Sequence, residues 1–403
     1  MTPALQSGSS VSTQESKPVT ANADVLRPDT LNLNELKLCT TKEDGEVKLR
    51  MGDSGQAAEP AITVNQMFLQ TVEQYGDQVA LASKDGDNWN RLTYKEYYQR
   101  CRTAAKSFLK LGLERYHGVG ILGFNSPEWF IADIGAILAG GFAVGIYTTN
   151  SPEACQYVAE NCKANVLVVE NHKQLQKILQ IQDKLPHVKA IIQYKDALKE
   201  KKPNLYTWAE FMEMGTDVPD SQLDEIIASQ KPNQCCTLIY TSGTTGQPKG
   251  VMLSHDNITW TASATGKTVK LKHACEAQEV VVSYLPLSHI AAQMIDIWLP
   301  IKYGGVIYFA QPDALKCNVN PDSGEPEDEL TPEAIEFCQK LGSKALKVSD
   351  IVGGKDRAVH KAIQEGIDRV NEQASSNAQK IQKWTILEKD FSLPGGELGK
   401  DCS

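Results

Sequence analysis

The chain has 403 residues, of which 41% are hydrophobic and 23% are charged, a balance typical of a globular protein with a buried core. Its formal net charge of −9 argues against a nucleic-acid-binding protein with a basic surface, because contacts with many phosphates need positive charge. A nucleotide held by a single loop is compatible with this charge. The length suits two or three domains.

The ten cysteines show neither a CxxC pair nor the Cys/His spacing of a zinc site, which indicates the reduced thiols of a cytoplasmic protein. Residues 1–55 start with a Ser, Thr and Pro bias and lack an apolar segment of signal-peptide length, so we expect a disordered or weakly ordered N-terminal extension. The apolar run from Trp129 to Tyr147 carries Asp133 and several glycines. It predicts a buried helix and then a buried strand, not a membrane span.

Helix and strand signals follow one another from residue 63 onward. A helix is predicted over 63–76, a β-hairpin turns at Asp85–Gly86, and Thr93 with Glu96 forms a capping box that opens the next helix. Apolar strands without alternation then alternate with helices, which indicates a mostly parallel sheet covered on both faces. The expected strands are 117–124, 142–148, 165–170 and 188–194, and the expected helices are 125–140, 150–164 and 171–186.

The second half begins with a polar link after residue 194. The pattern over 234–266 predicts a strand, a loop, a strand and a helix capped near Ser254, and that over 280–309 predicts a strand, a loop, a helix and a strand. An acidic, turn-rich stretch follows. Helices are expected after Thr331-Pro332 and over 356–387, where Val359, Ala362, Ile363, Gly366, Val370 and Ile381 are candidate inner positions.

The stretch from Tyr240 to Val251 reads YTSGTTGQPKGV and lies between two apolar strands. Its glycines let backbone N–H groups approach anionic oxygens, and its hydroxyl groups donate further hydrogen bonds. Lys249 adds a positive charge, and Pro248 stiffens the exit of the loop. These residues predict a loop that wraps a phosphate chain. The candidates for contact with phosphate are Thr241, Ser242, Gly243, Thr244, Thr245, Gly246, Gln247, Pro248 and Lys249.

This loop differs from the Walker A loop of P-loop hydrolases. The Walker pattern needs Gly-Lys followed by Ser or Thr, whereas Lys249 follows Pro248. A Gly-Lys-Thr triplet does occur at 266–268, but Thr261 stands where the first glycine of the pattern belongs. A P-loop hydrolase is therefore the weakest of the functional hypotheses.

Two signatures carry a family resemblance. YTSGTTGQPKGVMLSH resembles the phosphate-binding signature of the adenylate-forming superfamily, and YLPLSHIAAQ resembles its next signature, with His289 at the characteristic position. From about Leu36 onward the chain is similar to bubblegum-type long-chain fatty-acyl-CoA synthetases. The resemblance implies an α/β fold with layered, mostly parallel sheets, in which residues 56–316 form a partial AMP-binding domain and residues 317–403 a mainly helical C-terminal remnant.

The resemblance also implies a two-step ligation. ATP and a long-chain fatty acid give an acyl-adenylate and diphosphate, and CoA then displaces AMP to give the thioester. Residues Thr241 to Lys249 would hold the β- and γ-phosphates, and His289 would line the site between nucleotide, acyl chain and thiol, so Lys249 and His289 are the catalytic candidates. ATP, CoA and Mg²⁺ are the implied cofactors. The acyl substrate fits peripheral membrane contact, and the sequence indicates no particular protein partner.

Later signatures of the superfamily do not follow. Tyr303-Gly304 lacks the Thr-Glu that should come after it, and no Thr-Gly-Asp follows the phosphate loop. We therefore expect a large internal omission near Lys316–Cys317 and an altered C-terminus. The adenine and ribose contacts would then be missing and an apolar face would be bared, so little or no ligase activity is expected. The alternative is a non-catalytic fragment that binds phosphate or partner chains.

Overall fold

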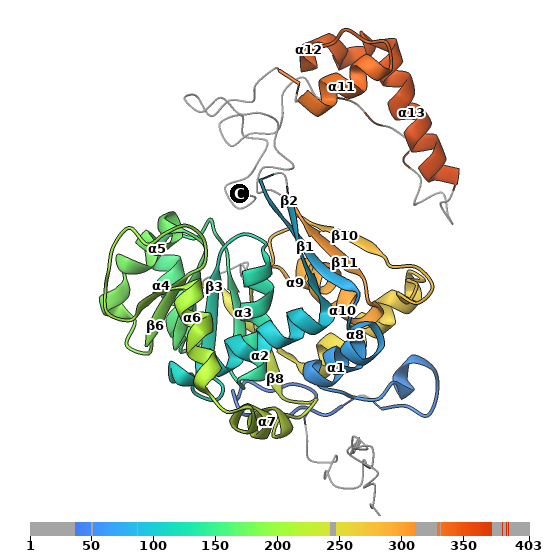
Figure 1. The fold of residues 1–403 in the computed structure, drawn as a ribbon. Coiled ribbons are helices and arrows are strands. Elements are labelled where there is room, and N and C mark those ends of the chain that lie inside the picture. Colours follow the sequence, from blue (N-terminus) through green and yellow to red (C-terminus); the bar gives the residue numbers. More distant parts are fainter. Residues whose placement is uncertain are drawn as a thin grey trace, which may run out of the picture.

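The structure is a computed structural model that describes residues 37–49, 51–86, 88–241, 247–310, 329–330, 332–372, 381, 384 and 386. Two β-sheets and the helices that cover them make up most of it (Figure 1). This arrangement confirms the expected α/β fold with mostly parallel sheets. The join expected near Lys316–Cys317 and the residues after 386 lie outside the described ranges.

The larger sheet has seven strands in the order β7-β6-β5-β3-β4-β8-β9. Neighbouring strands are parallel except for β8 and β9, which form an antiparallel hairpin. Every residue of β3 to β6 is buried, because these strands are apolar throughout and helices cover both faces. The strands are β3 (Gly118–Leu122), β4 (Phe142–Ile146), β5 (Val166–Val169), β6 (Ala190–Gln193), β7 (Leu205–Thr207), β8 (Cys235–Thr241) and β9 (Lys249–Ser254).

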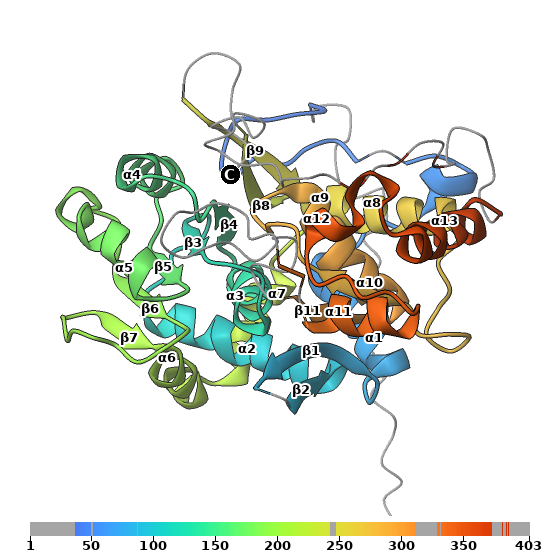
Figure 2. The ribbon, with the colours of Figure 1, turned by 90° about the horizontal axis from the view of Figure 1, so that it is seen from above.

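Alternate side chains of these strands point to opposite faces and enter two separate hydrophobic cores. Ile121 and Val168 belong to the core that includes residues of α2 and α3. Val144 and Leu167 belong to the core that includes residues of α4 and α5, on the other side of the sheet (Figure 2). These helices are α2 (Tyr94–Lys110), α3 (Pro127–Leu138), α4 (Pro152–Asn161) and α5 (His172–Leu179). The segment from Trp129 to Tyr147 is thus a buried helix and a buried strand, as expected.

The smaller sheet has four strands in the order β10-β11-β1-β2. The antiparallel hairpin β1–β2 confirms the turn expected near Gly86, and β11 joins β1 in parallel from the far end of the domain, with Leu81 opposite Ile307. Its strands are β1 (Val79–Asp85), β2 (Asn88–Thr93), β10 (Val280–Ser283) and β11 (Val306–Phe309). The neighbouring helical segments are α1 (Val64–Tyr75), α8 (His255–Thr268), α9 (Ile290–Gln293), the π-helical turn η5 (Met294–Trp298) and α10 (Leu299–Tyr303).

The polar link expected after residue 194 was wrong. Besides β7, this segment contains helices α6 (Trp208–Met214) and α7 (Asp220–Ala228). Thr207 and Glu210 form a capping box at the start of α6, a T-x-x-E signal that the sequence offers. Phe211 and Leu223 are fully buried, so one large apolar side chain anchors each short helix. Because the neighbouring residues are mainly polar, neither helix shows a clear apolar periodicity in the sequence. The 3-10 turns are η2 (Gly55–Ala58), η3 (Gln182–Lys184), η4 (Gly215–Asp217) and η6 (Val352–Gly354).

The C-terminal helices pack around a small core of their own, made by Cys338, Ala345, Ile351 and Val359. They are α11 (Pro332–Lys340), α12 (Val348–Ile351) and α13 (Arg357–Glu372). The expectation of an inner position at Ile381 was wrong, because its side chain is 46% exposed and lies outside a helix. Within the described ranges, no helix combines the length and apolar character that crossing a membrane requires.

Candidate functional site

The candidate site lies at the carboxyl edge of the seven-stranded sheet. In open sheets of parallel strands, ligands bind outside the carboxyl ends of the strands. Thr241 ends β8 at this edge, and β8 lies directly beside β4, with Ala143 opposite Thr237. The predicted phosphate loop therefore begins where a ligand of such a sheet would bind.

The stem of the phosphate loop is a regular antiparallel ladder. Tyr240 pairs with Gly250, and Thr241 pairs with Lys249, so residues 242–248 form the loop itself. The candidates at 242–246 lie outside the described residues, whereas Gln247, Pro248 and Lys249 lie within them. Lys249 is exposed, and none of the ion pairs between described residues includes it. Its ammonium group is therefore free of any described carboxylate and can meet an anionic ligand.

His289 lies on a loop that rests on the neighbouring strand β4. Gly145 of β4 allows this approach, because a Cβ atom there would lie 2.7 Å from the Cα atom of Ser288. His289 itself caps α9, and its Nδ1 accepts a hydrogen bond from the backbone N–H of Ala291 at 3.1 Å. The neutral ring then carries its proton on Nε2, on an exposed side chain. The two predicted signatures thus meet at two adjacent strands.

A buried polar chain fixes the loop that carries His289. Asn125, just after β3, donates from Nδ2 to Ser283 Oγ at 2.8 Å and to the carbonyl oxygen of Leu285 at 2.7 Å. Ser283 Oγ in turn donates to Asp296 Oδ2 at 2.7 Å. Burial raises the pKa of Asp296 to about 6, and the hydrogen bond from Ser283 opposes that rise. This chain connects the carboxyl end of β3 with both sides of the His289 loop.

Other reactive groups near the sheet are structural. Burial raises the pKa of the Cys235 thiol to about 12 and that of the Asp133 carboxyl to about 8, so both are neutral at pH 7. The Gly-Lys-Thr triplet at 266–268 lies in the last turn of α8, where the ring of Tyr303 packs against Gly266, and it forms no phosphate loop. Among the described residues, no group of three or more His, Cys, Asp or Glu is arranged to hold a metal ion.

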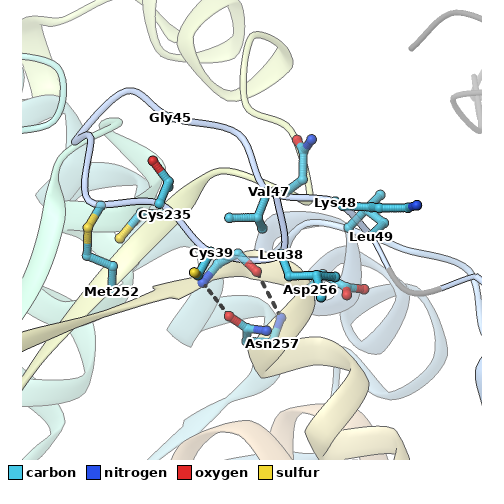
Figure 3. Close-up of a pocket in the computed structure, with 13 residues that line it drawn as sticks. Leu38, Cys39, Gly45, Val47, Lys48, Leu49, Cys235, Met252, Asp256 and Asn257 are labelled. Carbon is cyan, nitrogen blue, oxygen red and sulfur yellow. Dashed lines mark hydrogen bonds between the residues drawn. The ribbon is translucent and has the colours of Figure 1, made fainter. Parts of the chain in front are cut away.

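A pocket of about 350 Å³ lies at the opposite end of the β8–β9 hairpin (Figure 3). Residues 38–49 of the expected N-terminal extension form one wall, and Cys235 and Met252 lie on the other. Glu46 pairs with Gln234 in a β-bridge, and its carboxylate receives a hydrogen bond from Lys231 Nζ at 2.7 Å. This pocket is separate from the phosphate loop, because it surrounds the start of β8 and the end of β9.

Comparison with known proteins identifies the family. The model of the AMP-binding enzyme family matches residues 68–320, more than half of the chain. The chain belongs to this family. The long-chain-fatty-acid–CoA ligase ACSBG2 of Xenopus laevis is 43% identical over 643 positions that cover 95% of the chain and 87% of the relative. The human enzyme of the same name is 60% identical over 281 residues, 70% of the chain and 42% of the relative.

Solved structures show the same fold. The anthranilate CoA ligase AuaEII in complex with anthranoyl-AMP matches 63% of the chain and 46% of its own, with a TM-score of 0.53 and 22% identity. The A domain of carboxylic acid reductase from Segniliparus rugosus matches 64% of the chain and 46% of its own, with a TM-score of 0.51 and 20% identity. At these identities the likeness supports the fold alone.

The Xenopus alignment is much longer than the chain. It spans 643 positions and the chain has 403 residues, so at least 240 of its positions (643 less 403) hold no residue of this chain. Because the alignment takes in 95% of the chain, these positions lie between matched segments. The location of the omission near Lys316–Cys317 stays a prediction.

Sequence reasoning missed the supports of the site. Tyr157 and Asn161 of α4 hold the two ends of the phosphate loop, and Asn125 holds the His289 loop. No signal in the sequence singles out these side chains, because their partners lie far away along the chain.

Proposed function

We propose that the chain is a long-chain fatty acid–CoA ligase by descent that retains the triphosphate-binding part of its site. In the complete reaction, ATP and a long-chain fatty acid form an acyl-adenylate and release diphosphate, and CoA then releases AMP and forms the acyl-CoA. The observation that carries the proposal is the meeting of the Thr241–Lys249 hairpin and the His289 loop at the carboxyl ends of two adjacent strands.

In this proposal each group has a defined task. The backbone N–H groups and hydroxyls between Thr241 and Gln247 donate to the β- and γ-phosphates, and Lys249 offsets their charge. Nε2–H of His289 donates to an oxygen of the reacting carboxyl or phosphate group. Mg²⁺ supplies further charge compensation and would be held by the phosphates themselves, since the described residues provide no carboxylate cluster.

The proposal limits what this chain does alone. The described residues contain no counterpart of the adenine and ribose contacts that the family resemblance implies, and the Xenopus relative carries at least 240 further aligned positions (643 less 403). We therefore expect ATP to be held by its phosphates, with no assembled pocket for CoA and no completed thioester synthesis. A cytoplasmic location, with peripheral membrane contact through the acyl substrate, is part of the same proposal.

Phosphate binding is tested by titrating inorganic pyrophosphate and ATP into the full chain beside Lys249→Ala. Hydrogen bonds to charged groups contribute about 1.5–3 kcal/mol, so the variant should bind roughly 10- to 150-fold more weakly. Lys48→Ala is the matched control, because Lys48 lines the pocket at the other end of the hairpin. Equal affinity in all three proteins would contradict the assignment of Lys249.

One observation favours a second function, a non-catalytic fragment that binds another chain. Strand β10 is an edge of the smaller sheet as described, and its Val280 and Val282 are 63% and 53% exposed. Tyr284, Leu285 and Ile295 extend this apolar surface, as expected for a face bared by the omission. The opposite edge, β2, exposes mainly polar side chains such as Asn90 and Arg91.

Self-association through β10 is measurable by light scattering over a concentration series. We expect wild type to form larger species as its concentration rises, and Val282→Lys to remain smaller, because a charge on an edge strand opposes pairing. Asn90→Lys on the polar edge β2 is the control and should behave as wild type. If Val282→Lys and wild type gave identical masses, β10 would not be the contact surface.

A further inference from the structure

Both ends of the phosphate loop are attached to one helix, α4. At the exit, the hydroxyl of Tyr157 donates to the carbonyl oxygen of Pro248 at 2.9 Å. At the entry, the hydroxyl of Tyr240 donates to Asn161 Oδ1 at 2.6 Å. Tyr157 and Asn161 lie four residues apart, on the same face of α4, so one turn of helix reaches both strands of the hairpin stem.

The hydrogen bond at the entry is formed by a buried tyrosine that packs closely against Gly250. Tyr240 is nearly inaccessible to solvent, and burial raises the pKa of its hydroxyl, which therefore keeps its proton and donates. Gly250, paired with Tyr240 across the ladder, leaves room for the ring, since a Cβ atom there would lie 3.1 Å from Tyr240 Cζ. The tyrosine ring is thus confined between the stem of the loop and α4.

The attachment at the exit lies next to the predicted phosphate ligand. Pro248 immediately precedes Lys249, so the bond from Tyr157 holds the peptide unit that leads into Lys249. Proline has no backbone N–H, so the carbonyl group of Pro248 is its only backbone group that can form a hydrogen bond. The packing of Tyr157 against the core under α4 and α5 supports the donor.

Helix α4 is itself fastened to the rest of the sheet. Lys177 of α5 donates from Nζ to the carbonyl oxygens of Thr148 and Asn150, at 2.6 and 2.9 Å, just before α4 begins. Ser151 caps the helix by accepting from the backbone N–H of Ala154. A rigid support therefore runs from α5 through α4 to both ends of the loop.

We propose that Tyr157 and Asn161 are positioning residues that hold Pro248 and Tyr240, at the stem of the predicted phosphate loop, and so direct Lys249 toward an anionic ligand. The identity of that ligand rests on the proposed function, whereas the two hydrogen bonds to α4 are observed independently of it. With both strands of the stem held, Lys249 keeps a fixed direction and loses less conformational freedom when phosphate binds. Loss of either attachment should loosen the stem around Lys249 before any ligand is present and weaken the affinity of the chain for phosphate.

The first test is amide hydrogen exchange of the full chain without ligand. Tyr157→Phe keeps the ring and removes the hydroxyl, and we expect exchange of the segment 247–250 to become about two- to tenfold faster, the effect of one net hydrogen bond. Tyr206→Phe, on the distant edge strand β7, is the matched control and should leave this segment unchanged. Equal exchange in the two variants would overturn the proposal.

The second test titrates inorganic pyrophosphate into the same proteins. Tyr157→Phe should bind about two- to tenfold more weakly than Tyr206→Phe, and urea unfolding should show that both variants are folded before the titration. For the entry, Asn161→Asp keeps the oxygen acceptor and should retain wild-type exchange, whereas Asn161→Ala should accelerate it. Faster exchange throughout the seven-stranded sheet, in place of a change confined to residues 247–250, would assign Tyr157 to folding and overturn the positioning role.

The two tests separate the two proposals. If wild type binds no pyrophosphate, the proposed function fails while the exchange experiment still decides the attachment. If pyrophosphate binds and depends on Lys249 but neither measurement responds to Tyr157→Phe, the function stands and the role of α4 is wrong.

Discussion

Replacing Gly145 with alanine tests whether the loop that carries His289 rests on strand β4. A Cβ atom at position 145 would lie 2.7 Å from the Cα atom of Ser288 and 3.3 Å from Cζ2 of the buried Trp129. The nearest obstacle is backbone, so no side-chain rotation relieves the contact and either the loop or the strand must move. Overpacking of this kind costs about 1–3 kcal/mol, which exceeds the roughly 0.5–1 kcal/mol that alanine gains over glycine inside a strand.

Gly120→Ala provides the comparison within the same sheet. A Cβ atom at position 120 would lie 2.7 Å from Cδ2 of Leu167 and 3.0 Å from Cδ1 of Ile146, both ends of flexible side chains. Urea unfolding should therefore show Gly145→Ala to be less stable than Gly120→Ala by at least about 1 kcal/mol. If Gly145→Ala were as stable as wild type, the backbone of Ser288 would not lie on β4 and the two signatures would not share one edge.

Two further predictions concern stability. In the folded chain, burial raises the pKa of Asp296 to about 6, so the free energy of unfolding should fall by up to about 3 kcal/mol as pH rises from about 4 through 6. Urea titrations at several pH values should show this fall for wild type and not for Asp296→Asn. Parallel curves for wild type and variant would contradict the burial effect. Phe211→Ala should cost about 3–5 kcal/mol, since α6 is anchored by this fully buried ring; a cost below about 1 kcal/mol would mean that α6 is dispensable.

The parts of the fold that depend on local signals were predictable. Thr93 and Ser254 cap their helices as the sequence predicts, and the apolar strands β3 to β6 are buried on both faces. Capping and strand burial are properties of a few neighbouring residues. Helix α6 was not predicted, because its single buried phenylalanine gives no periodic pattern.

The pairing of distant segments was not predictable in the same way. Strand β11 joins β1 across most of the domain, and Tyr157 reaches Pro248 across 91 residues. A sequence shows that Tyr157 lies on a helix, but the partner of its hydroxyl depends on how two elements pack. The motif therefore predicted a phosphate loop, which stays a prediction, whereas the contacts of its stem with α4 became visible only in the structure.

The central proposal is that this chain keeps the predicted phosphate loop and the His289 loop but lacks the adenine, ribose and CoA contacts of a complete ligase site. Fatty-acid-dependent exchange of pyrophosphate into ATP, measured on the folded full chain beside Lys249→Ala, tests it most directly. The account predicts no exchange above background from either protein, although wild type binds pyrophosphate. Exchange by wild type that Lys249→Ala abolishes would contradict it, because adenylation would then proceed without the residues that the chain lacks.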